Sequence, residues 1–291
     1  RQMCIRDSHT SYAQMVGDWL FIKPSEVRFV QGDTDKVAYG RGSFGSRTMT
    51  IGGSALKLAC EQIISLAKEI SAFLNKCNVD EIEFKDGYLV PVRDGLRTFS
   101  LQELARETYR YGTALPANLA TGLQGVGYWS APPQNYPNGC YVVEVEIDED
   151  TGKVTLDRVT AIDDVGNVIN PLIFEGQVHG CIAQGAGQAL MEQIIYDDAG
   201  QVVTGSFIDY AMPKAEDFPF FKLDSMPVPT ATNLLGVKGG AETGTVGIPP
   251  AIINAVVDAV SDLGIKDISM PATPNKVWKV IKSAKEGVNH G

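Results

Sequence analysis

The sequence predicts an α+β fold in which β-hairpins and a mixed sheet pack against long helices. Pairs of short segments with alternating apolar residues are joined by turn residues, which is typical of hairpins. They are interleaved with longer segments whose apolar residues recur at helical spacing. The chain has 291 residues, of which 44% are apolar. It can therefore bury the core of one large domain or two ordinary ones.

The first residues of the chain, 1–8, match no structural pattern that follows, and we interpret them as a non-native leader. Residues 9–291 are expected to form one domain with two lobes that divide near residue 130. Within them, residues 13–20 have the spacing of a short amphipathic helix, and residues 26–30 alternate like a strand.

A long helix is predicted from Ser54 to Asn75. It follows a turn at residues 32–35 and a Gly- and Ser-rich loop at residues 40–53. Ser54 is placed as the N-cap, because its side chain can accept a hydrogen bond from the first helical turn. One face of the helix is apolar and carries Leu56, Cys60, Ile63, Ala67, Ile70 and Leu74.

Shorter elements follow this helix. Residues 81–89 suggest a hairpin that turns at Asp86-Gly87, and the sequence Ser100-Leu-Gln-Glu103 is a capping box that opens a short helix. Residues 113–139 are interrupted by Pro and Gly, so we expect a long surface connection.

The second half of the chain contains the clearest hairpin, which pairs residues 141–147 with residues 153–162. A second long helix is expected from just after Asn170-Pro171 to about Gln193. A further hairpin turns within residues 194–203. Pro249-Pro250 is expected to open a helix through Leu263, since Pro is favoured in a first helical turn. Residues 274–286 form a terminal helix.

Composition excludes several functions. The formal net charge of −10 argues against a nucleic-acid partner, because phosphate binding needs clustered Lys and Arg. No apolar run approaches the ~20 residues of a membrane-spanning helix. The five cysteines form no CxxC pair, so neither a disulfide framework nor a zinc or iron–sulfur site is indicated. A reducing cytoplasm is the expected location.

Thirty glycines concentrate in three clusters, and the first spans residues 42–53. Small residues let a ligand approach the backbone, and the following helix presents free N–H groups, so the cluster suits a phosphate. Ser46, Arg47, Thr48 and Thr50 could add donors. The alternative is a flexible loop that only caps the helix.

The second cluster lies inside the predicted helix, from Gly176 to Gly187. Four glycines in a helix interior cost about 4 kcal/mol relative to alanine. Either a closely crossing helix or a bound ligand should need the missing side chains. One helix face carries Gln177, Cys181, Gln184 and Gln188. These amides could bind a polar cofactor, or they could simply face solvent.

The third cluster, residues 239–247, holds one carboxylate, Glu242, before a helix N-terminus. Such a group could act as a general base, since the helix dipole helps to keep it ionised. The alternative is a glutamate that is merely solvated. Lys238 is a possible neighbour.

Taken together and in order, these segments resemble the large, molybdenum-binding subunit of the molybdenum hydroxylases. This family includes xanthine dehydrogenase, aldehyde oxidase and aerobic carbon monoxide dehydrogenase. The likeness covers residues 9–291 and corresponds to the second molybdopterin-binding domain. The matching segments are His9–Gln14, Gly32–Asp35, Gly45–Thr48, Val178–Gly185, Gly205–Tyr210, Gly236–Gly247 and Pro274–Ile281.

The resemblance implies a molybdenum ion held by a pterin dithiolene, in the cytosine dinucleotide form, with no metal ligand from the protein. It assigns Glu242 as the catalytic base and Gln184 as the glutamine beside the metal. Cofactor contacts are implied for Gly45, Ser46, Arg47, Thr48, Gly185, Gly240 and Ala241.

The implied reaction oxidises an aldehyde, an N-heterocycle or carbon monoxide, with water as the oxygen source. Electrons would pass to an iron–sulfur small subunit and an FAD-binding medium subunit, in a dimer of heterotrimers. The family's N-terminal half is absent from this sequence, so the chain alone is expected to be inactive. The competing hypothesis is a non-catalytic module of the same fold that binds a nucleotide phosphate or acts as a scaffold.

Overall fold

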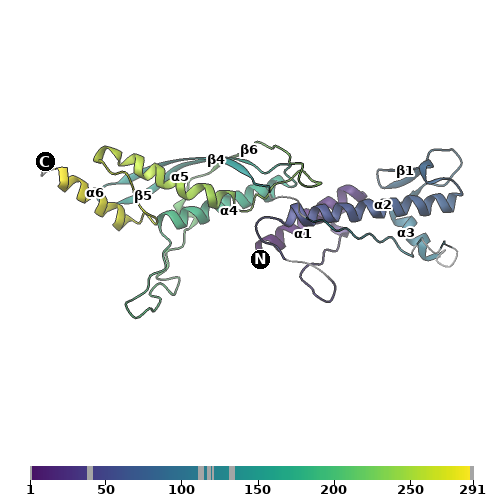
Figure 1. The fold of residues 1–291 in the computed structure, drawn as a ribbon, viewed down its shortest axis with the longest axis horizontal. Coiled ribbons are helices and arrows are strands. Elements are labelled where there is room, and N and C mark those ends of the chain that lie inside the picture. Colours follow the sequence, from purple (N-terminus) through teal and green to yellow (C-terminus); the bar gives the residue numbers. More distant parts are fainter. Residues whose placement is uncertain are drawn as a thin grey trace. The chain divides into compact units, whose positions relative to one another are not determined.

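The computed structural model describes residues 2–37, 42–110, 115–116, 119, 121–130 and 135–288, without the side chains of 2–7 and 288. The chain forms two compact units (Figure 1). The first comprises Arg1–Gln134 and Thr230–Val237, and the second comprises Asn135–Pro229 and Lys238–Gly291. Among the described residues, no helix is long and apolar enough to cross a membrane.

The first unit is built on two helices, α1 (Gln2–Leu20) and α2 (Ser54–Asn75). The bounds of α2 and its apolar face are confirmed, since Cys60, Ala67 and Ile70 lie in the core. Helix α1 includes the predicted helix at residues 13–20 but begins earlier, at Gln2.

The entry into α2 differs from the prediction. Residues Thr48–Gly53 form a π-helical turn that runs directly into α2, so Ser54 is not an N-cap. Instead, the buried Ser54 hydroxyl donates a hydrogen bond to the Thr50 carbonyl at 2.7 Å. A Cβ on Gly53 would lie 2.6 Å from Leu235 Cδ1. Glycine at this position therefore allows close packing against Leu235, a contact that the local sequence does not reveal.

A small antiparallel sheet completes the first unit, in the order β1 (Ile82–Lys85), β2 (Tyr88–Pro91) and β3 (Phe99–Ser100). The predicted turn is confirmed, because Asp86 and Gly87 have φ of 50° and 85°, as a two-residue hairpin turn requires.

The helix after this sheet, α3 (Leu101–Arg110), opens with the predicted capping box. Ser100 N–H donates to the Glu103 carboxylate at 3.0 Å, and Glu103 N–H donates to the Ser100 hydroxyl at 3.2 Å. The exposed Glu103 has a lowered pKa, because its carboxylate accepts hydrogen bonds from the backbone N–H and the hydroxyl of Ser100.

The structure also bears on the predictions for residues 26–30, 32–35 and 113–139. The strand predicted at residues 26–30 is wrong, because Pro24–Glu26 form a 3₁₀ turn and the residues after it pair with no described strand. The turn at residues 32–35 is confirmed by the Lys36 N–H bond to the Asp33 carbonyl, at 3.1 Å. Part of the predicted connection at residues 113–139 lies outside the described residues.

The second unit contains a mixed sheet, as predicted. Strands β4 (Asn138–Asp148) and β5 (Lys153–Asp164) form the antiparallel hairpin, and β6 (Lys222–Ser225) pairs with β5 in parallel. A β-bulge opposite Glu144 and Val145 shifts the register. Leu156 is buried before the bulge, and Val159, Ala161 and Asp163 are buried after it. The bulge thus keeps apolar residues on the core face along the whole strand.

Three helices complete the second unit: α4 (Pro171–Leu190), α5 (Thr243–Ala259) and α6 (Pro274–Val288). Helix α4 begins as predicted, with the Asn170 side chain accepting a hydrogen bond from Ile173 N–H at 3.0 Å. Helix α5 begins at Thr243, so the prediction that Pro249 opens it is wrong. Both prolines lie inside the helix, and the glycine-rich turn before them is helical.

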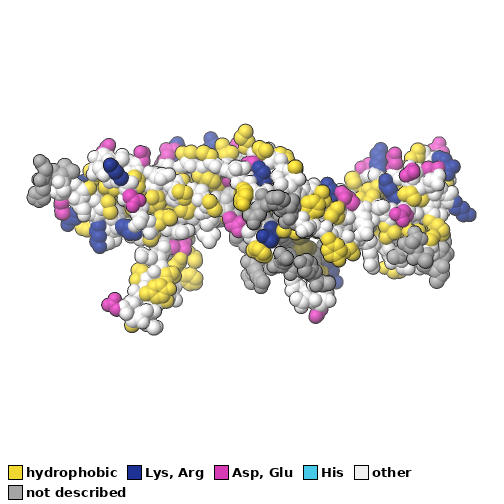
Figure 2. All heavy atoms as spheres, in the orientation of Figure 1, with side chains coloured by type: hydrophobic (Ala, Val, Ile, Leu, Met, Phe, Trp, Pro, Cys, Tyr) yellow, Lys and Arg dark blue, Asp and Glu magenta, His cyan; other side chains and the backbone are white. Residues whose placement is uncertain are grey.

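An arm at residues 191–214 projects from the end of α4 (Figure 1). It contains the predicted hairpin, which is confirmed by a bridge between Tyr196 and Val202 and by the left-handed Gly200, with φ of 80°. Apolar side chains cover much of the arm (Figure 2), and Phe207 and Ile208 are almost fully exposed.

Candidate functional site

The predicted phosphate contacts lie in a hydroxyl-rich turn of the first unit. Gly45 and Ser46 are both left-handed, with φ of 57° and 51°, and they turn the chain into the π-helical entry of α2. Thr48 Oγ1 donates to Ser43 Oγ at 2.9 Å, and Thr50 Oγ1 donates to the Arg47 carbonyl at 3.0 Å. Several hydroxyl groups therefore gather around one turn, at the start of a long helix.

Arg47 is the cation of this turn. Its guanidinium lies over the Phe44 ring, 4.1 Å from the ring centroid. Its Nε is buried and has no hydrogen-bond partner among the described residues, and the same holds for Oε1 of Gln31. Gln31 Nε2 donates to Ser43 Oγ at 3.5 Å. Gln31 was not among the residues predicted for the site, because Gln31 lies outside every glycine cluster.

The glycines of α4 divide into two groups. A Cβ on Gly185 would lie 3.1 Å from Pro249 of α5, so this glycine allows close helix packing. Gly187 is likewise enclosed, by Glu192 and Pro213. A Cβ on Gly176 or Gly180 would meet no described atom within 4 Å. Close helix packing thus accounts for Gly185 and Gly187, whereas the bound ligand stays a prediction for Gly176 and Gly180, which leave open space.

The helix face with Gln184 lies next to the first turn of α5. Gln184 is exposed, and its side-chain oxygen accepts a hydrogen bond from Thr245 Oγ1 at 3.5 Å. Cys181 is 3% exposed, so it does not share the solvent-facing side of the glutamines. Its thiol donates to the Ala241 carbonyl at 2.8 Å, and burial raises the pKa of the thiol.

Glu242 is the last residue before α5, and its side chain is exposed. Its carbonyl accepts a hydrogen bond from Val246 N–H at 3.2 Å. Gly240, two residues earlier, packs closely, because a Cβ there would lie 2.7 Å from Val165 Cγ1. The loop is therefore held at its backbone, while Glu242 itself is exposed.

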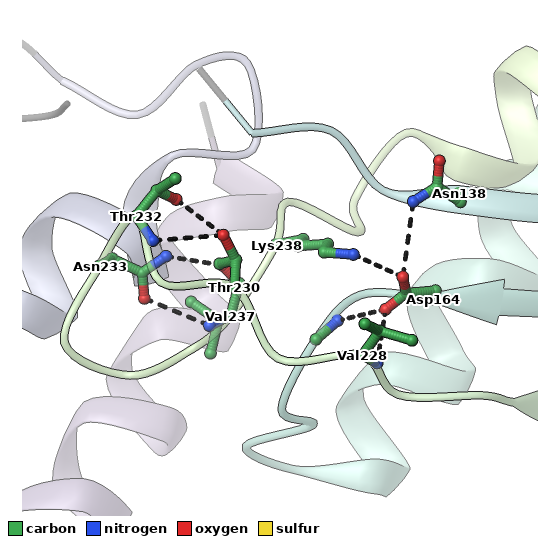
Figure 3. A network of polar contacts seen from close by, with 9 residues as sticks. Asn138, Asp164, Val228, Thr230, Thr232, Asn233, Val237 and Lys238 are labelled. Carbon is green, nitrogen blue, oxygen red and sulfur yellow. Dashed lines mark hydrogen bonds and ion pairs between the residues drawn. The ribbon is translucent and has the colours of Figure 1, made fainter. Parts of the chain in front are cut away.

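Lys238, at the start of this loop, pairs with Asp164 rather than with Glu242 (Figure 3). The ammonium and carboxylate are 2.5 Å apart, and both side chains are nearly buried. The same carboxylate accepts hydrogen bonds from the backbone N–H groups of Gly166 and Val228, each at 2.9 Å. Burial by itself would raise the pKa of Asp164, but Lys238 and these N–H groups lower it to about 2.

This pKa predicts a pH-dependent stability. The value of about 2 lies below the ~3.9 of an unperturbed Asp, so the pair stabilises the fold above about pH 4. The stabilisation is lost as pH falls toward 2. We expect Asp164→Asn to lower the free energy of unfolding of the full chain by about 1–2 kcal/mol at pH 7 and by much less near pH 2.5. Denaturant unfolding at both values measures this difference.

Asp157→Asn is the matched control, since Asp157 is an exposed residue of the same strand. Its effect should be small at both pH values. An Asp164→Asn variant as stable as the wild type at pH 7 would show that the ion pair does not stabilise the fold.

Asp163 is the second carboxylate at this strand end, and it is 2% exposed. The Tyr141 hydroxyl donates to its two oxygens at 2.9 and 2.7 Å. The Thr243 hydroxyl, at the start of α5, lies close to it and donates a hydrogen bond to the Gly240 carbonyl at 3.4 Å. Burial raises the pKa of Asp163, and the hydroxyl groups of Tyr141 and Thr243 oppose this rise.

The segment that leads into the loop belongs to the first unit and is a compact turn (Figure 3). Asn233 Oδ1 accepts hydrogen bonds from the N–H groups of Leu235 and Val237, at 3.1 and 3.2 Å. Its Nδ2 donates to the Val237 carbonyl at 2.7 Å. Lys238 follows directly and begins the second unit's part of the loop.

The structure thus brings Gln184, Gly185, Gly240, Ala241 and Glu242 together around the contact of α4 with α5. Gly45, Ser46, Arg47 and Thr48 lie together in the first unit and are described with that unit alone. Among the described residues, no group of three or more His, Cys, Asp and Glu side chains could share a metal ion. The roles of all nine residues toward a cofactor stay predictions.

A fold of this kind, with a phosphate-suited turn and a glycine-rich helix beside a carboxylate loop, is matched by known proteins. A family model described as a molybdopterin cofactor-binding domain matches residues 7–219. The chain belongs to this family, so the resemblance and the fold class predicted from the sequence are confirmed.

Two curated relatives are close in sequence. The carbon monoxide dehydrogenase large chain of Hydrogenophaga pseudoflava is 33% identical over 94% of this chain and 34% of its own length. The nicotine 6-hydroxylase large subunit of Paenarthrobacter nicotinovorans is also 33% identical, with the same two coverages. The chain therefore spans about a third of the length of these relatives.

Solved structures also match the fold of this chain. A Cu,Mo-CO dehydrogenase matches with a TM-score of 0.87 and 34% identity, over 96% of this chain and 35% of that one. Quinoline 2-oxidoreductase from Pseudomonas putida 86 matches with a TM-score of 0.85 and 30% identity, over 94% of this chain and 35% of that one.

Proposed function

We propose that the chain is part of the catalytic subunit of a molybdenum-dependent hydroxylase and supplies its second molybdopterin-binding domain. The reaction oxidises an aldehyde, an N-heterocycle or carbon monoxide, with oxygen from water. The observation that supports this most is the placement of Gln184 and Glu242 at one helix contact, in a chain whose relatives are named as such enzymes.

The residues present fit a molybdenum–pterin cofactor. Arg47 offers a buried Nε without a partner among the described residues, next to several hydroxyl groups. Gly176 and Gly180 leave open space on the glycine-rich helix. When bound, the cofactor supplies the two-electron redox centre of the hydroxylation.

The chain's own residues bind and orient the cofactor. Arg47, with Ser46 and Thr48, holds phosphate oxygens through charge-assisted hydrogen bonds, and the helix that follows favours the negative charge. The Gln184 amide hydrogen-bonds the cofactor near its reacting end. Glu242 accepts the proton that is released as the substrate is hydroxylated.

Finer features of the assembly belong to the same proposal. The cofactor is the cytosine dinucleotide form, and the partners are an iron–sulfur subunit and an FAD-binding subunit in a dimer of heterotrimers. The complex works in the cytoplasm. Residues 9–291 form the molybdopterin-binding domain.

Elemental analysis of the natively purified complete complex tests this function against the non-catalytic alternative. We expect about one molybdenum per catalytic subunit. The exposure of Glu242 within the described chain is the observation that favours a module without catalysis. A complex that holds all partner subunits but no molybdenum would establish that alternative.

Arg47→Ala should lower the molybdenum occupancy of the complete enzyme. Loss of a charge-assisted hydrogen bond costs about 1.5–3 kcal/mol, so cofactor affinity should fall by roughly 10–100-fold. Molybdenum per subunit, measured after dialysis, checks the prediction. Arg106→Ala, which removes an exposed arginine of α3, is the control and should retain the metal. Equal occupancy in both variants would remove Arg47 from the cofactor site.

A further inference from the structure

Two adjacent residues at the end of β5, Asp163 and Asp164, contact the two ends of the loop that carries Glu242. Neighbouring residues of a strand point to opposite faces of the sheet. The loop comprises residues 238–242. The Asp163 carboxylate is buried near the start of α5, while the Asp164 carboxylate lies beside Lys238, at the start of the loop.

The start of the loop is held by two contacts to this strand end, of which Figure 3 shows the ion pair between Lys238 and Asp164. Lys238 N–H donates to the Val165 carbonyl at 2.7 Å. The Lys238 ammonium pairs with Asp164, whose side chain is 12% exposed. Asp164 is itself oriented by hydrogen bonds from the N–H groups of Gly166 and Val228, each at 2.9 Å.

The end of the loop lies against Asp163. The Thr243 hydroxyl, one residue after Glu242, lies close enough to this buried carboxylate to lower its pKa and donates a hydrogen bond to the Gly240 carbonyl at 3.4 Å. The Tyr141 hydroxyl donates to the same carboxylate at 2.7 Å, and the surroundings are closely packed. A Cβ on Gly139 would lie 2.5 Å from the Asp163 carboxylate, and a Cβ on Gly247 would lie 2.5 Å from the Tyr141 ring.

Between these ends, the loop backbone is held from α4. The Cys181 thiol donates to the Ala241 carbonyl at 2.8 Å, and Gly240 packs against Val165 and Phe174. The backbone on both sides of Glu242 is thus fixed while its side chain stays exposed. This arrangement suits a base that must meet a group brought from outside this unit.

We propose that Asp163 and Asp164 are positioning residues, which fix the two ends of the loop and so hold Glu242 in the geometry required for proton transfer. The proposal rests on the proposed function of Glu242 as the base. A displacement of about 1 Å at a reacting group can lower a rate 100-fold, so loss of either anchor should reduce turnover without removing the base.

The experiment uses the complete enzyme with Thr243→Val, which removes the hydroxyl at nearly constant volume, and Thr243→Ser, which keeps it. We expect Thr243→Val to lower kcat by roughly 10–100-fold, with KM and molybdenum content little changed. Thr243→Ser should restore kcat to within a few-fold of the wild type. Thr155→Val, at an exposed position of β5, is the control.

Lys238→Met tests the other anchor and should lower kcat in the same way. A second readout does not depend on activity: amide hydrogen exchange of residues 239–247 should become faster in Thr243→Val and Lys238→Met, with unchanged exchange in β4 and β5. Faster exchange confined to this loop, together with rescue by Thr243→Ser, supports the proposal.

The outcomes separate the two proposals. If Glu242→Gln abolishes turnover but Thr243→Val and Lys238→Met keep full kcat and wild-type exchange, the positioning role is overturned and the proposed function stands. If Glu242→Gln keeps full turnover, the base assignment fails and the positioning role fails with it, whatever the exchange data show.

Discussion

Replacing Glu242 by glutamine in the complete enzyme should lower kcat by about 10²–10⁴-fold, which is the usual contribution of a general base. Glutamine has nearly the same size and keeps a hydrogen-bonding side chain, but it cannot accept the proton. The molybdenum content should stay at the wild-type level, since no cofactor contact is removed. Steady-state kinetics and elemental analysis of the same preparation measure both quantities.

Glu146→Gln provides the matched control, because Glu146 is an exposed carboxylate on the outer face of β4. Its turnover should equal that of the wild type. If Glu242→Gln were as active as Glu146→Gln, another group would have to be the base.

Replacing Gly244 by valine should destabilise the second unit by about 3 kcal/mol. A Cβ at this position would lie 2.8 Å from Cys181 Cβ and 2.9 Å from the backbone nitrogen of Ile182. Valine would therefore force α5 away from α4 at the turn that follows Glu242. Denaturant unfolding of the full chain measures the loss.

Gly180→Val is the corresponding control on α4, where a Cβ meets no described atom within 4 Å. Its free energy of unfolding should change by no more than about 0.5 kcal/mol, because the helix propensity of valine is no lower than that of glycine and the position is exposed. Equal effects at both positions would mean that close packing at Gly244 does not hold the two helices together.

The elements that could be predicted from the sequence are those that neighbouring residues determine. The Asp86-Gly87 turn requires two left-handed residues, and the capping box pairs Ser100 with Glu103 three residues away. The bounds of α2 followed from its apolar periodicity. In each case, the interactions that define the element lie within a few residues.

The errors arose where distant contacts decide the local structure. Gly53 packs against Leu235, and Gly244 packs against Cys181. Local propensity placed the start of α5 too late, at Pro249, and assigned the π-helical turn Thr48–Gly53 before α2 to a loop. Residues 26–30 alternate like a strand but have no partner strand among the described residues.

The candidate site followed the same rule. Arg47, Gln184 and Glu242 could be predicted as site residues because each lies within a cluster of glycines in the sequence. The contacts that hold the loop could not be predicted, because Asp163 and Thr243 lie 80 residues apart in the sequence and match no motif. The available signal was an acidic pair, Asp163-Asp164, at the end of a strand that mixes apolar and polar residues.

The central claim is that the carboxylate of Glu242 is held where it can take a proton from the reaction centre. The most direct measurement is a structure of the complete enzyme with its cofactor bound. The account predicts that the Glu242 carboxylate lies about 3 Å from the reacting group, or is separated from it by one water molecule. A carboxylate that remains in bulk water, away from the cofactor and from Gln184, would contradict it.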